Sequence, residues 1–236
     1  MSSGPATSSR PPQACQPGGR VDLDLVEAVF AVGAGLPVAE LAVAGDPATA
    51  RAAAAALWMA RLWGDRDGHA CLCLGIDGHL TQGGSFEFRR FAQCFDRWPE
   101  GRHRLLAQAM AAADQADVYV GVLLRSRPSR RAGTAQPGRV AWADVDGAWT
   151  TQRAQALARL GGWPTWQVQS GSGRHLYLPL EDLEPPERLE RWNRRLAAFL
   201  QADSGWSQTK LLRLPGTYNH KARAAGGRSR LVQWLW

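Results

Sequence analysis

The chain has 236 residues, of which 45% are hydrophobic and 11 are tryptophan, so it is long enough to bury a sizeable core. No apolar run approaches the roughly 18 residues of a membrane-spanning helix, and the N-terminus lacks a secretory signal pattern, so no membrane partner is expected. The formal net charge of +7 fits a nucleic-acid or nucleotide partner, although an Arg-rich composition also arises from a GC-rich genome.

The first part of the chain divides into a tail and a helical region. Residues 1–20 are rich in Ser, Pro and Gly and predict a disordered tail. In residues 21–64 apolar residues recur at helical spacing, and Asp46-Pro47 is typical of a helix N-terminus. We expect this helical region to assist template or partner binding.

Residues 65–236 predict a mixture of strands and helices with antiparallel hairpins, which favours an α+β fold. A strand is expected at 69–76, with Asp77-Gly78 as its hairpin turn. Residues 86–95 fit a strand or a helix. Further strands are expected at 118–124, 139–145, 165–170, 175–179 and 231–236, and helices at 103–116, 150–160 and 186–202.

Two carboxylates end the strand expected at 139–145. Residues two apart in a strand point to the same face, so Asp144 and Asp146 are expected to lie side by side. Two such charges repel and require a cation or a shared proton between them, and oxygen ligands of this kind suit Mg²⁺ or Mn²⁺ bound with substrate phosphates. The alternative is a surface turn, because Gly147 follows directly.

A glycine-rich segment runs from Ser170 to His175 (SGSGRH) between two expected strands. Its small residues allow a ligand to approach the backbone and expose amide groups that can bind phosphate. A histidine beside such a turn can donate to a phosphate or sugar oxygen. The alternative is a simple hairpin with a half-buried histidine.

A third polar segment runs from Arg213 to Lys221 (RLPGTYNHK) around a Pro-Gly turn. Both basic side chains can reach a triphosphate: Arg213 with a bidentate guanidinium group and Lys221 with a compact ammonium group. The alternative is a surface turn between strands. Asp203 follows the helix expected at 186–202 and is either a turn cap or a third metal carboxylate.

The cysteines do not indicate a metal or disulfide framework. Cys71 and Cys73 alternate along a strand without a second Cys-x-x-Cys arm, so a structural zinc site is not expected. A reducing cytoplasm is the simplest location for such a chain.

In this order, the three segments resemble the motifs of the archaeo-eukaryotic primase superfamily, especially the primase-polymerase (PrimPol, bifunctional DNA primase/polymerase) domains of phage and plasmid replication proteins. Residues 142–146 look like the first acidic motif, 170–175 like the Ser-Gly-x-Gly-x-His motif, and 213–221 like the Arg-x-Pro-Gly-Thr-x-Asn-x-Lys segment. The resemblance covers residues 65–236, which are therefore expected to form the catalytic domain.

The resemblance implies a modified RRM-like antiparallel sheet beside a second α/β unit, with the active site in the cleft between them. Two Mg²⁺ or Mn²⁺ ions would be ligated by Asp144, Asp146 and Asp203. His175 would contact the phosphates of an incoming NTP or dNTP. The implied nucleotide-binding residues come from the glycine-rich and basic segments: Ser170, Gly171, Ser172, Gly173, Arg174, His175, Arg213, Asn219 and Lys221. An Arg-rich loop is expected to follow the template phosphates, or else to be a solvated insertion, and its arginines are Arg125, Arg127, Arg130 and Arg131.

These features predict a template-dependent nucleotidyltransferase, a DNA primase/polymerase that initiates or extends primers on single-stranded DNA by a two-metal mechanism. Two alternatives stay open: a non-catalytic module that binds single-stranded nucleic acid or nucleotides with the same fold, and a metal-dependent nuclease that uses the same carboxylates. Because the sequence holds no P-loop motif, a helicase or another replication or repair partner would be a separate chain or a further part of this one.

Overall fold

The structure is a computed structural model that describes residues 23–32, 46–160 and 166–235. The tail expected at residues 1–20 lies outside these ranges. The helices are α1 (Leu23–Val32), α2 (Pro47–Trp63), α3 (Arg102–Ala112), α4 (Thr151–Ala158) and α5 (Pro186–Leu200), with short 3₁₀ helices η3 (Ala132–Thr134) and η4 (Lys221–Ala225). The strands are β1 (Gly68–Leu80), β2 (Phe86–Trp98), β3 (Asp117–Gly121), β4 (Gly138–Val145), β5 (Trp166–Gln169), β6 (Arg174–Glu184), β7 (Leu211–Arg213), β8 (Tyr218–Asn219), β9 (Arg230–Leu231) and β10 (Gln233–Leu235).

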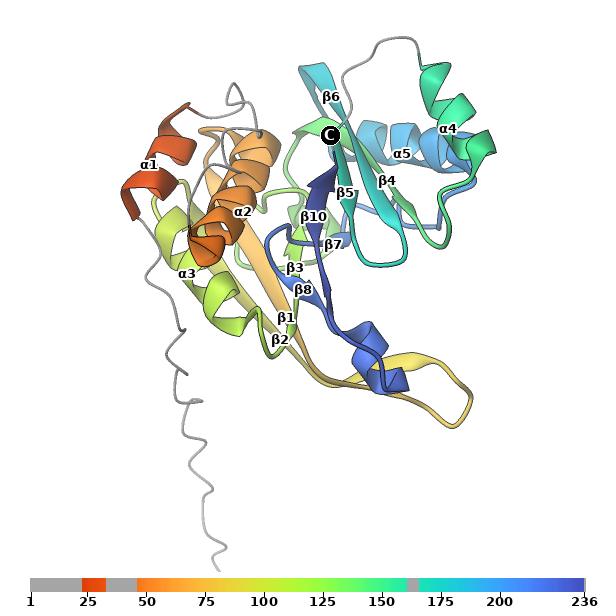
Figure 1. Ribbon diagram of the computed structural model, residues 1–236. Helices are drawn as coiled ribbons and strands as arrows, with labels where there is room; N and C mark the ends of the chain where they lie inside the picture. Colours follow the sequence, from red (N-terminus) through yellow and green to blue (C-terminus); the bar gives the residue numbers. More distant parts are fainter. Residues whose placement is uncertain (1–22, 33–45, 161–165, 236) are drawn as a thin grey trace, which may run out of the picture.

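Two antiparallel sheets form the framework, which confirms the predicted α+β class. The first sheet has the strand order β2-β1-β3-β7 and the second has the order β10-β5-β6-β4. In Figure 1, α1, α2 and α3 lie on one side of the sheets and α4 and α5 on the other. None of the helices in the described ranges is long and apolar enough to cross a membrane.

The long β1–β2 hairpin differs from the sequence prediction. β1 continues through Asp77-Gly78 to Leu80, and the turn instead lies after it, where Thr81 N donates to Ser85 O at 2.8 Å. Asp77 keeps a positive φ of 53°, and Gly78 leaves room for the ring of Phe86 on the opposite strand. The Asp-Gly pair therefore serves a bend and a close packing contact within a strand, so its prediction as the turn was wrong.

Helix α2 carries much of the core. Asp46 caps it as predicted, since its side chain accepts a hydrogen bond from Thr49 N. Its Trp63 Nε1 donates to Val122 O, just after β3, whereas Trp58 packs against Tyr177 of β6 with ring centroids 5.9 Å apart. The helix thus contacts both sheets and shares one hydrophobic core with them. A boundary between helical region and catalytic domain at residue 64 stays a prediction.

The second sheet is buried on both faces, and this sets where its polar residues can lie. Val140 and Trp142 of β4 belong to the core shared with α2, whereas Ala141 and Ala143 pack with residues of α5 in a separate cluster. The alternation along β4 assigns Asp144 to the same face as Trp142. On that face of β4, the apolar side chains of Val140 and Trp142 are followed by the carboxylate of Asp144 near the end of the strand.

Candidate active site

Asp144 occupies the end of the apolar row on β4, directly opposite His175 on β6. The register pairs Asp144 with His175 and Trp142 with Tyr177, so acid and imidazole belong to the same face of the second sheet. His175 Nε2 lies 3.6 Å from Asp144 Oδ1. Asp144 of the acidic motif and His175 of the glycine-rich motif, 31 positions apart in the chain, therefore meet through strand pairing.

Lys210 joins this pair from the other sheet. Its Nζ lies 2.7 Å from Asp144 Oδ2, and it directly precedes β7 of the first sheet. Burial raises the pKa of the Asp144 carboxyl, but the attraction of the protonated form of His175, present at low pH, and of Lys210 outweighs it, so the pKa lies below its usual range. Asp144 is thus an anion held at the junction of the two sheets.

His175 is buried and neutral at pH 7. Burial lowers its pKa to about 4, although Asp144 acts in the opposite direction. Its Nδ1 lies 3.2 Å from the hydroxyl of Tyr177, which orients the ring. Because the imidazole carries no charge, Lys210 is the cation that balances Asp144.

The other two predicted metal ligands, Asp146 and Asp203, have backbones close to Asp144, but both residues are exposed. β4 ends at Val145, so Asp146 follows the strand and is exposed. Asp203 N donates to the backbone oxygen of Asp144 at 2.8 Å, while its own carboxylate accepts from Ser204 N at 2.7 Å. Asp203 therefore caps its own turn, and its role as third ligand stays a prediction.

A hydrogen-bonded lock joins the glycine-rich segment to the basic segment. Asn219 Nδ2 donates to Ser170 O at 2.5 Å, and its Oδ1 accepts from Lys221 N at 3.0 Å. Gly171 has a φ of 129°, and a Cβ there would lie 2.3 Å from Asn219 Nδ2, so this position requires glycine. The two segments form one structure although 43 residues separate Ser170 from Arg213.

A hollow of about 220 Å³ opens beside this lock. Its lining combines Ser172 from the glycine-rich segment with Asn219 and Lys221 from the basic segment, and Arg230 from β9. Arg230 Nη1 also donates to Gly171 O at 3.4 Å. Two cationic side chains, a hydroxyl and an amide around a small hollow are suited to an anionic group such as a phosphate.

Arg213 forms an ion pair with Asp117, a residue that the sequence did not indicate as its partner. Its Nε donates to Asp117 Oδ1 at 3.0 Å, and Asp117 is only 1% exposed. The same carboxylate oxygen accepts from His220 N at 3.3 Å, and the guanidinium carbon of Arg213 lies 4.9 Å from the ring centroid of Tyr119. Arg213 is thus held between Asp117 and Tyr119, and its role in binding a triphosphate stays a prediction.

The Arg-rich loop separates into buried and exposed parts. Arg125 is fully buried and donates from Nη2 to Gln208 O at 2.8 Å, so it is not available at the surface to contact a template. Arg127 and Arg131 are exposed, and Arg130 is half-buried. Arg174 packs over Trp149, with its guanidinium carbon 4.6 Å from the ring centroid.

The donor set fits a divalent cation bound by few protein ligands. Among residues 23–32, 46–160 and 166–235, no group of three or more His, Cys, Asp or Glu side chains is placed to hold a metal ion. Asp144 is nevertheless a half-buried carboxylate, with 15% of its side chain exposed, that already pairs with the ammonium group of Lys210, and Asp146 is two residues away. Mg²⁺ is commonly held by one or two carboxylates with substrate phosphates completing its coordination, so Asp144 and Asp146 are the candidate ligands, and metal binding stays a prediction.

The sequence did not single out Lys210, Asp117, Arg230 or Tyr177. Lys210 and Lys221 are the only lysines in the chain, and this contrast with the many arginines was the one available signal for Lys210. Asp117 and Arg230 carry no motif, because their importance comes from partners about a hundred and about sixty residues away, respectively.

Comparisons with known proteins agree with this architecture. No family model and no curated protein matches the sequence. The catalytic domain of primase RepB' in complex with initiator DNA is 16% identical, with a TM-score of 0.51 over 81% of this chain and 85% of that one. The AEP domain of the cyanophage S-2L primase-polymerase is 12% identical, with a TM-score of 0.49 over 71% of this chain and 80% of that one. The likeness to the RepB' domain establishes that the chain has a primase-polymerase catalytic fold, as the order of its motifs predicted.

Proposed function

We propose that this chain, which has the fold of a primase catalytic domain, is a template-dependent nucleotidyltransferase that initiates or extends primers on single-stranded DNA. The observation that carries the proposal is the convergence of Asp144, His175 and Lys210 at the junction of the sheets. An anionic carboxylate there would hold Mg²⁺ or Mn²⁺, and the hollow lined by Ser172 and Lys221 would hold phosphate.

The metal would be held by Asp144 and Asp146, with Asp203 as the third candidate ligand. When bound, divalent cations in such sites activate the attacking hydroxyl and stabilise the leaving pyrophosphate. Lys210 would leave Asp144 when that carboxylate binds a cation, and its ammonium group would then be free for the triphosphate. The 2.7 Å contact between Lys210 Nζ and Asp144 Oδ2 supports both roles, because Asp144 already pairs with one cation.

The chain's other residues would bind and orient the nucleotide. His175 presents a neutral imidazole fixed by Tyr177, so the protonated Nε2 could donate one hydrogen bond to a phosphate oxygen without adding charge. Lys221, Arg230 and the amide groups around Gly171 would neutralise the triphosphate, whose charge repels an attacking oxygen. The buried Asn219 would hold the glycine-rich segment and the basic segment next to each other through its hydrogen bonds with Ser170 and Lys221.

The test is incorporation of labelled NTP or dNTP on a primed or unprimed single-stranded DNA template with Mg²⁺ or Mn²⁺. Asp144→Asn and Asp146→Asn should each abolish incorporation, whereas Asp182→Asn, an equal charge change at an exposed position of β6, should not. Asp146 is also exposed, so its variant separates catalysis from folding. Full incorporation by both site variants would refute the proposal.

The same assay separates the alternatives. Shortening of the labelled primer with the metal present would indicate a nuclease that uses the same carboxylates. Tight binding of the template with neither extension nor shortening would indicate a non-catalytic nucleic-acid-binding module.

A further inference from the structure

Four aromatic side chains form a continuous strip on the first sheet. Phe86 and Phe88 have ring centroids 4.9 Å apart, and Phe88 lies 6.0 Å from Phe91. Tyr119 completes the strip, with centroid distances of 6.1 Å to Phe88 and 6.2 Å to Phe91. We call Phe86, Phe88, Phe91 and Tyr119 the aromatic strip.

Two glycines on the neighbouring strand allow the rings to lie close to the backbone. A Cβ on Gly75 would lie 2.5 Å from the ring of Phe88, and one on Gly78 would lie 2.4 Å from the ring of Phe86. Any larger residue at either position would lift these rings off the sheet. The glycines of β1 thus support a platform of rings, which explains their place inside a strand.

The strip is partly exposed and has cationic side chains beside it, unlike a core cluster. Phe91 is 39% exposed, and Phe86, Phe88 and Tyr119 are half-buried. Arg130 lies over Phe91 at 5.9 Å from its centroid, and Lys221 lies over Phe86 at 5.8 Å. With Arg213 over Tyr119, three of the four rings have a cation beside them.

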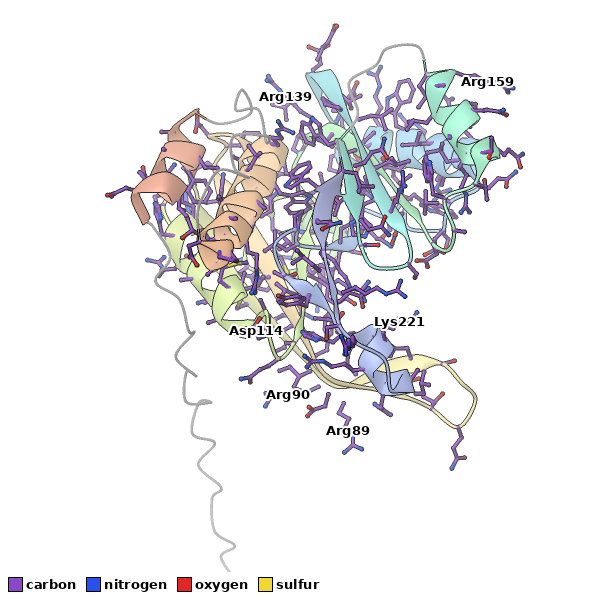
Figure 2. The ribbon with its side chains drawn as sticks, viewed as in Figure 1. Arg89, Arg90, Asp114, Arg139, Arg159 and Lys221 are labelled. Atoms are coloured by element: carbon purple, nitrogen blue, oxygen red, sulfur yellow. The ribbon has the colours of Figure 1, made fainter. Side chains whose placement is uncertain are left out.

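The strip leads away from the candidate active site. Tyr119 pairs in register with Arg213, and Lys210, which binds Asp144, comes three residues before Arg213. From Tyr119 the rings continue along the β1–β2 hairpin, and Lys221 on η4 faces this hairpin, as Figure 2 shows. Arg89 and Arg90 extend from the same hairpin (Figure 2), and both are exposed.

We propose that the aromatic strip binds single-stranded nucleic acid, with bases stacked on Phe91 and its neighbours and phosphates paired with Arg130. Stacked rings beside cations suit a single strand, because every base has a π-face and every link carries a negative charge. A duplex hides its base faces and gains nothing from the rings. The proposal deepens the proposed function, on which it rests for the identity of the strand as the template.

Binding of a fluorescent oligothymidylate to the full chain, followed by anisotropy in EDTA, tests the strip without any catalysis. Phe91→Ala should weaken binding roughly 5- to 160-fold, the range for loss of one stacking contact. Phe199→Ala is the matched control, because Phe199 is also exposed, at 43%, but lies on α5. Arg130→Gln should lower the slope of log affinity against log salt by about one.

Three results would overturn the proposal: unchanged affinity in Phe91→Ala, equal losses in both phenylalanine variants, or an equal loss for blunt duplex DNA. Self-association or protein binding that Phe91→Ala abolishes, with oligothymidylate affinity unchanged, would assign the strip to a protein partner instead. These measurements need no nucleotide incorporation. The proposal for the aromatic strip can therefore be refuted while the chain is an active enzyme, and it can be supported while the proposed activity is absent.

Discussion

A single methyl group at Gly173 should damage the candidate active site. A Cβ built on Gly173 would lie 2.4 Å from the backbone oxygen of Val145 and 3.2 Å from Cα of Asp146. Ordinary contact begins near 3.4 Å, so Gly173→Ala forces the loop and the end of β4 apart by 3.4 − 2.4 = 1.0 Å. Neither obstacle is a flexible side chain that can turn away.

The displacement predicts two separate losses. Overpacking of this kind costs about 1–3 kcal/mol of unfolding free energy. A misplacement of about 1 Å between catalytic groups can cost on the order of 100-fold in rate, and here it separates the residues after Asp144 from the segment that leads into His175. We therefore expect incorporation to fall roughly 100-fold in Gly173→Ala while the chain stays folded.

The measurements are urea unfolding and the incorporation rate at saturating nucleotide. Gly133→Ala is the control, because a Cβ at Gly133 meets nothing within 4 Å and its φ is not positive. That variant should change stability by less than about 0.5 kcal/mol and leave the rate unaltered. Wild-type stability and rate in Gly173→Ala would refute the steric argument.

Two further predictions concern a hydrogen-bonded lock and a charged pair. Asn219→Ala removes one buried and one part-buried hydrogen bond, which should lower the unfolding free energy by about 1–3 kcal/mol and raise KM for the nucleotide. An unchanged KM would show that these hydrogen bonds do not shape the site. The hydrogen bond from Arg104 lowers the pKa of Asp96, so this pair stabilises the fold above the ordinary Asp pKa and loses its effect as pH falls through the lowered value. Arg104→Gln should therefore be less stable than wild type at pH 6, and in urea titrations the difference should shrink as the pH falls below the ordinary Asp pKa. A stability difference that does not vary with pH would contradict this.

Local patterns predicted much of the fold because they depend on neighbours in the chain. Asp46-Pro47 indicated the start of α2, and the apolar spacing after Pro186 indicated α5. The strand carrying Asp144 was predicted within a residue of β4. The prediction of a hairpin turn at Asp77-Gly78 was wrong because a turn-forming pair also suits a bend within a strand. Gly78 lies inside β1 because the ring of Phe86 on the opposite strand packs against it.

Residues whose surroundings come from distant segments could not be assigned in this way. Arg125 belongs to an arginine-rich stretch, yet it is fully buried and donates to Gln208 O in the segment before Lys210. Lys210 had no motif, and its contact with Asp144 depends on how the first sheet meets the second.

The sequence by itself determined which groups are present: a carboxylate pair, a glycine-rich segment and a basic segment, in an order that resembles the primase-polymerase motifs. It could do so because ligand chemistry and backbone freedom are properties of single residues and short spacings. Only the tertiary structure decided that Asp144 lies opposite His175, that Lys210 balances its charge, and that Asn219 locks two of the segments together. Charge balance and packing act between elements that the chain brings together from far apart, and no spacing in the sequence encodes those distances.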